Sequence, residues 1–556
     1  MDAGRGRGGA PRAVRAGLLA LVAVASRALR VAPLVLLAPL SLVACGGEGG
    51  DGGADEGPTT RGAFAGADIV LISLDTLRAD DVSPYGAAPA LSPVLQAFAE
   101  EAVLFEHARA QAPQTAPSHM SLFTSMYPSA HGVQNVQHGV DPETGRRGPL
   151  IEAVPDSIPT LAQVLSAAGY RSIGLTDGGN LNAAHGFPRG FEEYTLDLSG
   201  GRAQLEDGKR WVAELAAGEQ PFFLFWHTYE IHAPYVSPGP YVDRWAPKAY
   251  DGVLAGVLDQ LEGLDFKRRF AAMKSVFWKD KADFGWDESA YLHGLYRAGV
   301  QYTDELMGEL FESLRASGAF DESIIVVLSD HGEEFYEHGQ WQHDQVYEEC
   351  LRVPLMIRLP GGVGGGTRIE TPVALMDVMP TLLELVDVSP SVLDDGGPAA
   401  AMRPRMQGHS LARALLTAEE PEARPIYSEY RADRPGGPLF DWQIAIHHEG
   451  WKFIVDEVRG EKIDGEVVQK HELYDLGADP DEQQDAADGQ DVMVQRFLRL
   501  REEYKRGLDA FAELERLDAG ATLDEATLRS LVELGYIDGS ALQGLDGGGV
   551  RGDDGD

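Results

Sequence analysis

The chain has 556 residues, of which 87 are Asp or Glu and 47 are Lys or Arg, so its formal net charge is −40. This acidity opposes nucleic-acid binding and the long-range steering of polyanions, so an anionic substrate must be met by a locally positive site. Cys45 and Cys350 are the only cysteines, which excludes a disulfide framework and requires a core held by burial alone.

The first 66 residues divide into a basic part, an apolar run and a Gly- and acid-rich stretch. Six arginines precede the apolar run at 31–44, an order typical of a secretory signal. The run ends in Leu42-Val43-Ala44-Cys45, which resembles a bacterial lipobox, so 1–44 are expected to be cleaved and Cys45 to be lipidated. Residues 45–66 are expected to form a flexible tether. The alternative is an uncleaved anchor; both place the protein in a bacterial cell envelope, attached to the membrane and outside the cytoplasm.

The first predicted strand covers residues 68–74 and is followed at once by Asp75. Its continuous apolar character is typical of a strand buried on both faces. In open α/β sheets, ligands bind beyond the carboxyl ends of such strands, where Asp75 lies. The alternative is a turn Asp that caps the following helix.

Thr115 is the next residue along the chain that could take part in catalysis. Pro117 suits the first position of a helix, and Ser118 to Ser125 can continue it. The Thr115 hydroxyl would then lie at a helix N-terminus, where N–H groups and the helix dipole favour an anion. A Thr hydroxyl becomes a nucleophile only when a metal or a base removes its proton, and an ordinary N-cap Thr is the alternative.

The middle of the chain alternates predicted strands and helices. The expected elements are a helix at 161–168, strands at 171–176 and 222–226, and a helix at 292–314 with Tyr302 and Leu306 on its inner face. Residues 201–290 are expected to be largely irregular, either shaping a substrate pocket or packing as loops.

A second apolar run, 323–329, ends at Asp330 and His331. If this strand and the one before Asp75 share a sheet, both acidic ends point to one crevice. Two carboxylates and one imidazole suit a divalent ion such as Ca, Mg, Mn or Zn. His343 follows closely and is expected to bind the transferred or leaving group, or to act as a general acid.

These patterns predict an α/β fold with a mostly parallel sheet covered by helices. The catalytic domain is expected at 67–395, with a linker to a small C-terminal antiparallel α+β subdomain at 406–515. Residues 516–556 are expected to form a helical appendix and a disordered acidic tail.

Several pieces of the chain, in their order and spacing, resemble the sulfatase family of the alkaline-phosphatase-like superfamily between residues 67 and about 515. The pieces are Leu74-Asp75-Thr76-Leu77-Arg78-Ala79-Asp80, Thr115-Ala116-Pro117-Ser118-His119, Gly169-Tyr170-Arg171, Asp330-His331-Gly332-Glu333-Glu334, Arg352-Val353-Pro354 and Glu472-Leu473-Tyr474-Asp475-Leu476. A weaker piece is His227 with His232-Ala233-Pro234-Tyr235. The resemblance implies the alkaline-phosphatase-like fold.

The resemblance also implies one divalent cation. Asp75, Asp330 and His331 match the family's metal ligands, and Thr115 matches the nucleophile that reaches the metal. Family members usually carry a second early Asp; this chain has Thr76 there, so one ligand is missing or supplied differently. The family's nucleophile is a Cys or Ser that becomes formylglycine. Thr115 cannot be converted, so no formylglycine is expected.

Three histidines match positions that contact the substrate in the family. His119 stands where the family has an Arg, and His232 matches a His that contacts the anionic group. His343 falls where many relatives have a Lys that holds the same group. The resemblance therefore implies catalytic roles for all three.

The resulting prediction is a sulfatase-like, metal-dependent hydrolase of sulfuric or phosphoric/phosphonic esters that uses a metal-activated Thr115. A Thr ester lacks the second hydroxyl by which formylglycine expels sulfate, so the nucleophile favours a phosphate ester as the substrate. The resemblance to the family favours a sulfate ester. The substrate is expected to be a small anionic ester, a glycan or a lipid. The alternatives are a transferase that moves a phospho-headgroup to envelope lipid or glycan, and a non-catalytic binding lipoprotein of the same fold.

Overall fold

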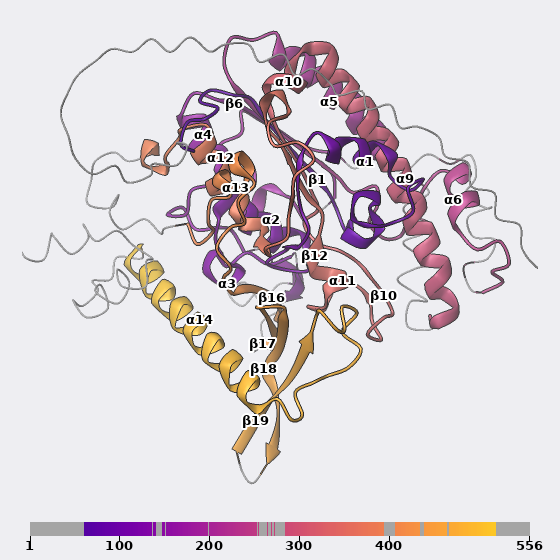
Figure 1. Cartoon of the computed structure of the whole chain (residues 1–556), viewed down its shortest axis with the longest axis vertical. Helices are drawn as coiled ribbons and strands as arrows, with labels where there is room; N and C mark the ends of the chain where they lie inside the picture. Colours follow the sequence, from indigo (N-terminus) through magenta and orange to yellow (C-terminus); the bar gives the residue numbers. More distant parts are fainter. Residues whose placement is uncertain are drawn as a thin grey trace, which may run out of the picture. The chain divides into compact units, whose positions relative to one another are not determined.

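The computed structural model describes residues 60–518, apart from 136, 141–146, 151, 179, 198, 253, 255–263, 265–267, 269–271, 273–283, 394–405, 434–438 and 464–465. An eight-stranded sheet with the order β14-β2-β13-β9-β1-β8-β6-β7 forms the centre (Figure 1). Its strands are β1 (Ile69–Leu74), β2 (Val103–Phe105), β6 (Arg171–Thr176), β7 (Glu193–Leu196), β8 (Phe222–Thr228), β9 (Ile324–Leu328), β13 (Leu355–Arg358) and β14 (Arg368–Ile369). The run from β9 to β7 is parallel throughout, whereas β13 pairs antiparallel with both β9 and β2.

Helices cover both faces of this sheet. The side chains of β1 alternate between two apolar clusters, with Leu71 in one and Val70 and Ile72 in the other. The cluster of Leu71 includes side chains from α2 (Thr115–Thr124), α4 (Leu161–Ala167), α12 (Val378–Leu385) and α13 (Ala412–Thr417). The other cluster includes α1 (Pro93–Glu100), α5 (Gly201–Ala216) and α9 (Trp286–Ser317). Because both faces are covered, the central strands are largely apolar.

The C-terminal part is an antiparallel sheet of four strands with one long helix against it. The strands are β16 (Ile426–Asp433), β17 (Leu439–His448), β18 (Trp451–Ile463) and β19 (Glu466–Asp475), and the helix is α14 (Asp491–Asp518). Phe497 of α14 packs in one apolar cluster with Ile444 and Phe453 of the sheet. The predicted antiparallel α+β subdomain is therefore confirmed.

The remaining strands and α-helices are short. The strands are β3 (Ala108–Arg109), β4 (Gln137–Val140), β5 (Arg147–Leu150), β10 (Glu334–Phe335), β11 (Trp341–Gln342), β12 (Arg352–Val353) and β15 (Val373–Ala374). The helices are α3 (Pro128–His131), α6 (Gly239–Trp245), α10 (Ala319–Glu322) and α11 (Glu348–Leu351). Among the described residues, no helix combines the length and hydrophobicity needed to span a membrane.

The structure corrects two expectations about irregular segments. Residues 60–66, expected to belong to the tether, fold against α12: Gly62 N donates to Glu384 O at 2.9 Å and Phe64 N donates to Leu385 O at 2.9 Å. Residues 201–216, expected to be irregular, form α5, because its apolar side chains recur at helical spacing and pack on the sheet.

Three segments named above lie outside the described residues. They are the proposed leader with Cys45 and most of the tether, the linker at 394–405, and the C-terminal segment beyond 518.

Candidate active site

The candidate site lies where three adjacent parallel strands end. Asp75 follows β1 directly, Asp330 and His331 follow β9, and His227 lies near the end of β8. Because β9, β1 and β8 are neighbours with the same direction, their carboxyl ends deliver these side chains to one edge of the sheet. All four residues are at most 1% exposed.

His331 is the centre of the site. Its Nε2 lies 3.3 Å from Asp330 Oδ2, 3.8 Å from Asp75 Oδ1 and 3.3 Å from Thr115 Oγ1. Its Nδ1 lies 2.9 Å from the carbonyl oxygen of Gly332, so Nδ1 carries the proton that donates this bond. Burial lowers the pKa of His331 to about 3, so the ring is neutral and Nε2 presents a lone pair.

The residues around His331 fit a divalent cation. Asp75 Oδ1 and Asp330 Oδ2 are buried and have no hydrogen-bond partner among the described residues. Burial and the negative charge of Asp330 raise the pKa of Asp75 well above its ordinary value. Two carboxylates and an imidazole lone pair that converge in a buried site are the donors expected around a metal ion. The N–H of His331 bonded to a carbonyl is the usual orientation of a ligating imidazole. Asp75, Asp330 and His331 would hold the ion, and Thr115 Oγ1 is close enough to join them.

Thr115 is the first residue of α2 and is 2% exposed. The helix begins earlier than predicted: Ser118 N donates to Gln114 O at 3.1 Å, so Pro117 is the third helical residue and not the first. The hydroxyl of Thr115 therefore lies at the positive end of the helix dipole, as predicted. This position favours negative charge on a group that reaches Thr115.

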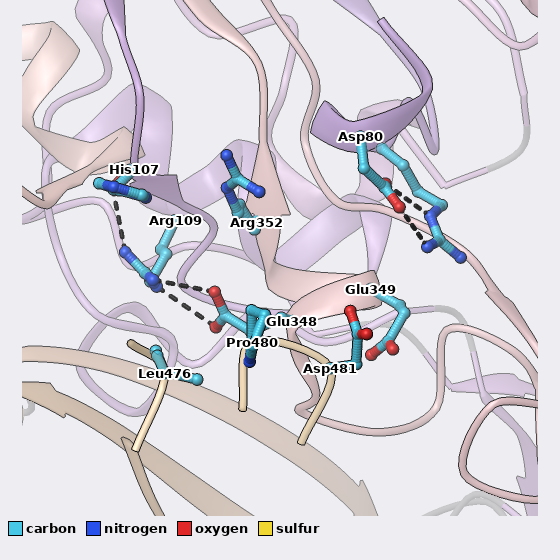
Figure 2. A pocket seen from close by; sticks show the side chains of 10 residues that line it. Asp80, His107, Arg109, Glu348, Glu349, Arg352, Leu476, Pro480 and Asp481 are labelled. Atoms are coloured by element: carbon cyan, nitrogen blue, oxygen red, sulfur yellow. Dashed lines mark hydrogen bonds and ion pairs between the residues drawn. The ribbon is translucent and has the colours of Figure 1, made fainter. Parts of the chain in front are cut away.

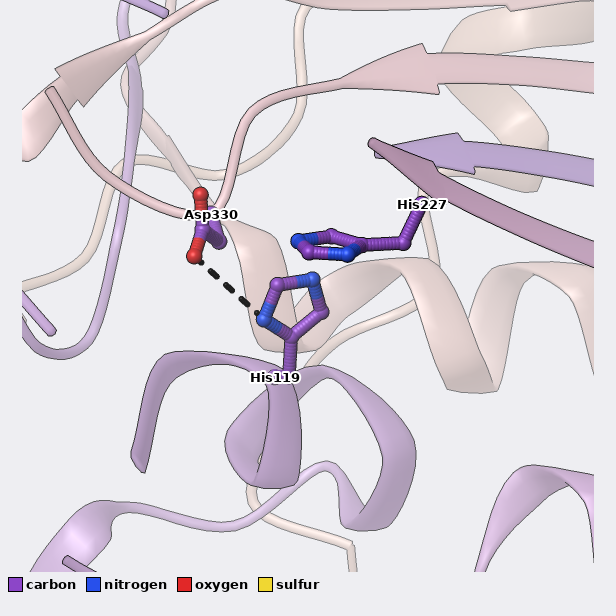
Figure 3. Close-up of side chains that lie close together, drawn as sticks. All are labelled: His119, His227 and Asp330. Carbon is purple, nitrogen blue, oxygen red and sulfur yellow. Dashed lines mark ion pairs between the residues drawn. The ribbon is translucent and has the colours of Figure 1, made fainter. Parts of the chain in front are cut away.

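His119 does not supply the positive charge that the family's Arg supplies. Its Nδ1 donates to the carbonyl oxygen of Thr115 at 2.9 Å, so its Nε2 accepts from Ser73 Oγ at 2.9 Å. Burial lowers the pKa of His119 to about 4, which leaves the ring neutral. His119 therefore holds the backbone at the nucleophile position. Its Nδ1 also lies 3.4 Å from Asp330 Oδ2 (Figure 3).

His227 is a further site residue, to which the sequence predicted no catalytic or metal-binding role. Its Nε2 lies 3.1 Å from Asp75 Oδ2, and its Nδ1 lies 3.4 Å from the backbone N of Asp177. His119, His227 and Asp330 form a second set of potential ligand atoms that shares Asp330 with the first (Figure 3). His227 directly follows the strand predicted at 222–226. The reasoning that identified Asp75 at the end of its strand could therefore have identified His227 as well.

His343 and His232 lie beside the proposed metal ligands. The ring of His343 is 4.4 Å from that of His331 and 5.2 Å from that of His232. Burial by itself lowers the pKa of His343, but the Glu333 carboxylate, 3.0 Å from Nδ1, outweighs it and raises the pKa to about 9. Burial lowers the pKa of His232 well below its ordinary value, and its Nε2 bonds to the Tyr229 hydroxyl at 2.7 Å. His343 and His232 therefore offer one cationic and one neutral imidazole to an anionic group.

Thr76 shows how the chain differs at the family's second acidic position. Its hydroxyl donates to the carbonyl oxygen of Asp75 at 2.7 Å, and its backbone N donates to Asp330 Oδ1 at 3.3 Å. A φ of 61° places this β-branched residue in the left-handed region, which is strained. Thr76 therefore orients Asp330 through its backbone, and its side chain is turned to Asp75 O.

The chain matches the family model Sulfatase over residues 67–388 and the model N-sulphoglucosamine sulphohydrolase, C-terminal, over residues 336–506. Choline-sulfatase of Rhizobium meliloti (strain 1021) is 33% identical over 185 residues, which cover 33% of this chain and 31% of the relative. Arylsulfatase K of Danio rerio is 29% identical over 257 residues, which cover 44% of this chain and 46% of the relative. The chain thus spans less than half the length of these two curated relatives.

Solved structures match over more of the chain. The phosphonate monoester hydrolase of Agrobacterium radiobacter superposes with a TM-score of 0.59 at 18% identity, covering 80% of this chain and 95% of that one. A protein solved in complex with its substrate D-glucosamine-2-N,6-O-disulfate has a TM-score of 0.57 at 18% identity, covering 80% of this chain and 98% of that one. These likenesses confirm the predicted fold.

Proposed function

The chain belongs to the sulfatase family, and on this premise we propose that it hydrolyses singly charged sulfuric, phosphoric or phosphonic esters, with Thr115 as the nucleophile. The position of the Thr115 hydroxyl carries the proposal: it lies 3.3 Å from His331 Nε2, and that nitrogen lies 3.3 Å from the Asp330 carboxylate. A hydroxyl held among metal-ligand atoms at a helix N-terminus is placed for attack on an anionic ester.

The charges around Thr115 favour a monoanion over a dianion. Asp75 and Asp330 together carry two negative charges, which one divalent cation offsets. His343 and Glu333 form a further pair of opposite charges. These groups leave no large positive excess for a phosphate monoester dianion. Sulfate esters, phosphodiesters and phosphonate monoesters each carry a single charge, and we place the two phosphorus esters first because Thr115 lacks the second hydroxyl of formylglycine.

Each residue has a defined part in this reaction. A divalent cation held by Asp75, Asp330, His331 and Thr115 would supply the positive charge that acidifies the hydroxyl and stabilises charge on the transferred group. Thr115 Oγ1 releases its proton to solvent and forms a bond to sulfur or phosphorus as the bond to the leaving oxygen breaks. His343, whose raised pKa keeps it protonated at neutral pH, gives its proton to that oxygen. Water then attacks the Thr115 ester in line, gives one proton to His343 and frees Thr115 Oγ1 for the next cycle.

The test is a substrate panel on purified protein, first treated with chelator and then supplied with Ca, Mg, Mn or Zn. The panel contains an aryl sulfate, an aryl phosphodiester, an aryl phosphonate monoester and, as the dianionic control, an aryl phosphate monoester. We expect the monoanions to be cleaved, with the phosphorus esters faster than the sulfate and the phosphate monoester slowest. Absence of cleavage of every monoanion with every ion would contradict the proposal. A phosphoryl product found on an added lipid or glycan acceptor, and not on water, would favour the transferase.

A further inference from the structure

Outside the candidate active site, His338, Glu349 and Glu482 bring potential ligand atoms to within 4.8 Å of one another. His338 lies in the turn between β10 and β11, Glu349 in α11, and Glu482 in the segment between β19 and α14. Their side chains are 9%, 7% and 0% exposed. Three segments of the fold therefore meet at this buried cluster, which we call the hairpin cluster.

Two polar atoms of the hairpin cluster lack hydrogen bonds. His338 Nε2 and Glu349 Oε2 are buried and have no hydrogen-bond partner among the described residues, whereas Glu482 Oε1 lies 2.7 Å from Lys452 Nζ. A buried polar atom without a partner costs about 1–3 kcal/mol, so such atoms are rarely gathered in one place without a ligand between them. Their convergence indicates a bound cation.

The distances also fit a shared ion better than a direct bond. His338 Nε2 and Glu349 Oε2 are 3.4 Å apart, longer than the roughly 2.7–2.9 Å of a charge-assisted hydrogen bond. Two ligands on one tetrahedral ion, each at about 2.0–2.1 Å, are separated by about 3.3 Å. The His338 ring stacks on Tyr347 with centroids 3.7 Å apart and 8° between the planes, which holds its orientation.

Two nearby cations pair with the carboxylates of Glu482 and Glu348. Lys452 Nζ lies 2.7 Å from Glu482 Oε1 and 3.3 Å from Glu348 Oε1. Arg109 pairs with Glu348 at 2.8 Å. The partner of Glu349 is His338: burial by itself lowers the pKa of that imidazole, but the Glu349 carboxylate outweighs burial and raises the pKa. An ion bound by the hairpin cluster would take the place of the His338 proton beside Glu349.

A cavity lies beside the hairpin cluster. It measures about 130 Å³, and Glu349 and Asp481, the neighbour of Glu482, form part of its wall (Figure 2). A water molecule occupies about 30 Å³ of liquid, so this space admits water alongside an ion.

We propose that His338, Glu349 and Glu482 form a second metal site, which takes a divalent transition-metal ion and fits zinc best. One imidazole and two carboxylates are a donor set that zinc accepts, and the cavity leaves room for water as a further ligand. The ion joins the β10–β11 hairpin and α11 to the segment that follows β19. Its role is structural, because it links the catalytic part to the C-terminal subdomain away from Thr115.

Zinc content, measured by elemental analysis after chelation, reloading and desalting, tests the proposal without any activity assay. The wild-type chain is expected to retain about two ions, and Glu349→Gln and Asp330→Asn about one each, because each removes one site. The double variant is expected to retain none. Glu349→Gln removes a buried charge without changing shape, so the chain should still fold. Asp481→Asn, which removes a charge from the same cavity wall, is the matched control and should bind as the wild type does.

A second measurement separates the two sites. In the Asp330→Asn background, added zinc is expected to raise the melting temperature, since a ligand that binds only the folded state stabilises it. Adding Glu349→Gln should abolish that rise. Equal zinc content in Glu349→Gln and the wild type, or an unchanged rise in the double variant, overturns the proposal. Neither result depends on whether the chain hydrolyses an ester.

Discussion

At the scale of single residues, the tautomer of His331 organises the candidate active site. The carbonyl of Gly332 binds the proton on Nδ1, so Nε2 faces two carboxylates and the Thr115 hydroxyl as a lone pair. Without a cation, this arrangement places three electron-rich atoms against one another in a buried site. The geometry therefore favours metal binding even before substrate is considered.

Removing the nucleophile tests the role of Thr115. Thr115→Ala is expected to lower kcat by about 10⁴- to 10⁶-fold on the best substrate of the panel, since losing a nucleophile has effects of this order. Thr115→Ser keeps the hydroxyl and is the matched control, so it should retain a substantial part of the turnover. Both variants are compared in steady-state assays at saturating metal. Turnover by Thr115→Ala close to that of the wild type would rule out a covalent Thr ester.

At the scale of elements, Asp68 joins the starts of three neighbouring strands. Its carboxylate accepts from the backbone N of Phe222 at 2.9 Å, and its carbonyl oxygen accepts from Ile324 N at 2.8 Å. Burial raises the pKa of Asp68 to about 6, against 3.8 for an ordinary Asp, and the charge of Glu322 adds to the shift. The folded state therefore binds more protons than the unfolded state between pH 3.8 and about 6.

This raised pKa predicts the sign of a pH effect. Asp68 costs stability as the pH rises through this window, and the cost persists above it. Asp68→Asn keeps an oxygen for Phe222 N but carries no charge, so its melting temperature should exceed that of the wild type at pH 8. The gain should shrink toward pH 4. Thermal unfolding at both pH values measures this, with the exposed Glu219→Gln as a control. A lower melting temperature for Asp68→Asn at pH 8 would refute the assignment.

At the scale of the whole molecule, a buried charge network connects the catalytic part to the C-terminal sheet. Lys452 of β18 is fully buried and reaches Glu348 of α11 and Glu482. Glu348 also pairs with Arg109 of β3 at 2.8 Å and with His447 Nε2 at 2.6 Å. The C-terminal subdomain is thus attached by buried ion pairs as well as by apolar packing.

Lys452→Met is expected to destabilise the chain by about 3–5 kcal/mol, because it leaves buried carboxylates without their cation. Lys505→Met is the control: Lys505 pairs with Glu457 but is 32% exposed, so its loss should cost at most about 1 kcal/mol. Chemical denaturation in the presence of chelator measures both without a contribution from bound ions. Equal free energies of unfolding for the two variants would show that the network does not join the two parts.

Attachment to the membrane through Cys45 stays a prediction, because that residue lies outside the described part of the chain. Mass spectrometry of the mature N-terminus tests it, and an acylated Cys45 is the expected result.

The sequence by itself determined four parallel strands of the central sheet, the edge where Asp75, Asp330 and His331 meet, and Thr115 at a helix start. These follow from local patterns, because a doubly buried strand is apolar throughout and the residue after it must lie at the sheet edge. The tertiary structure alone decided that His227 contacts Asp75 and that His119 is neutral. Those properties depend on burial and on partners such as Asp75 and His227, which are 152 residues apart. Protonation and pairing are set by the environment that folding creates, and no local pattern records it.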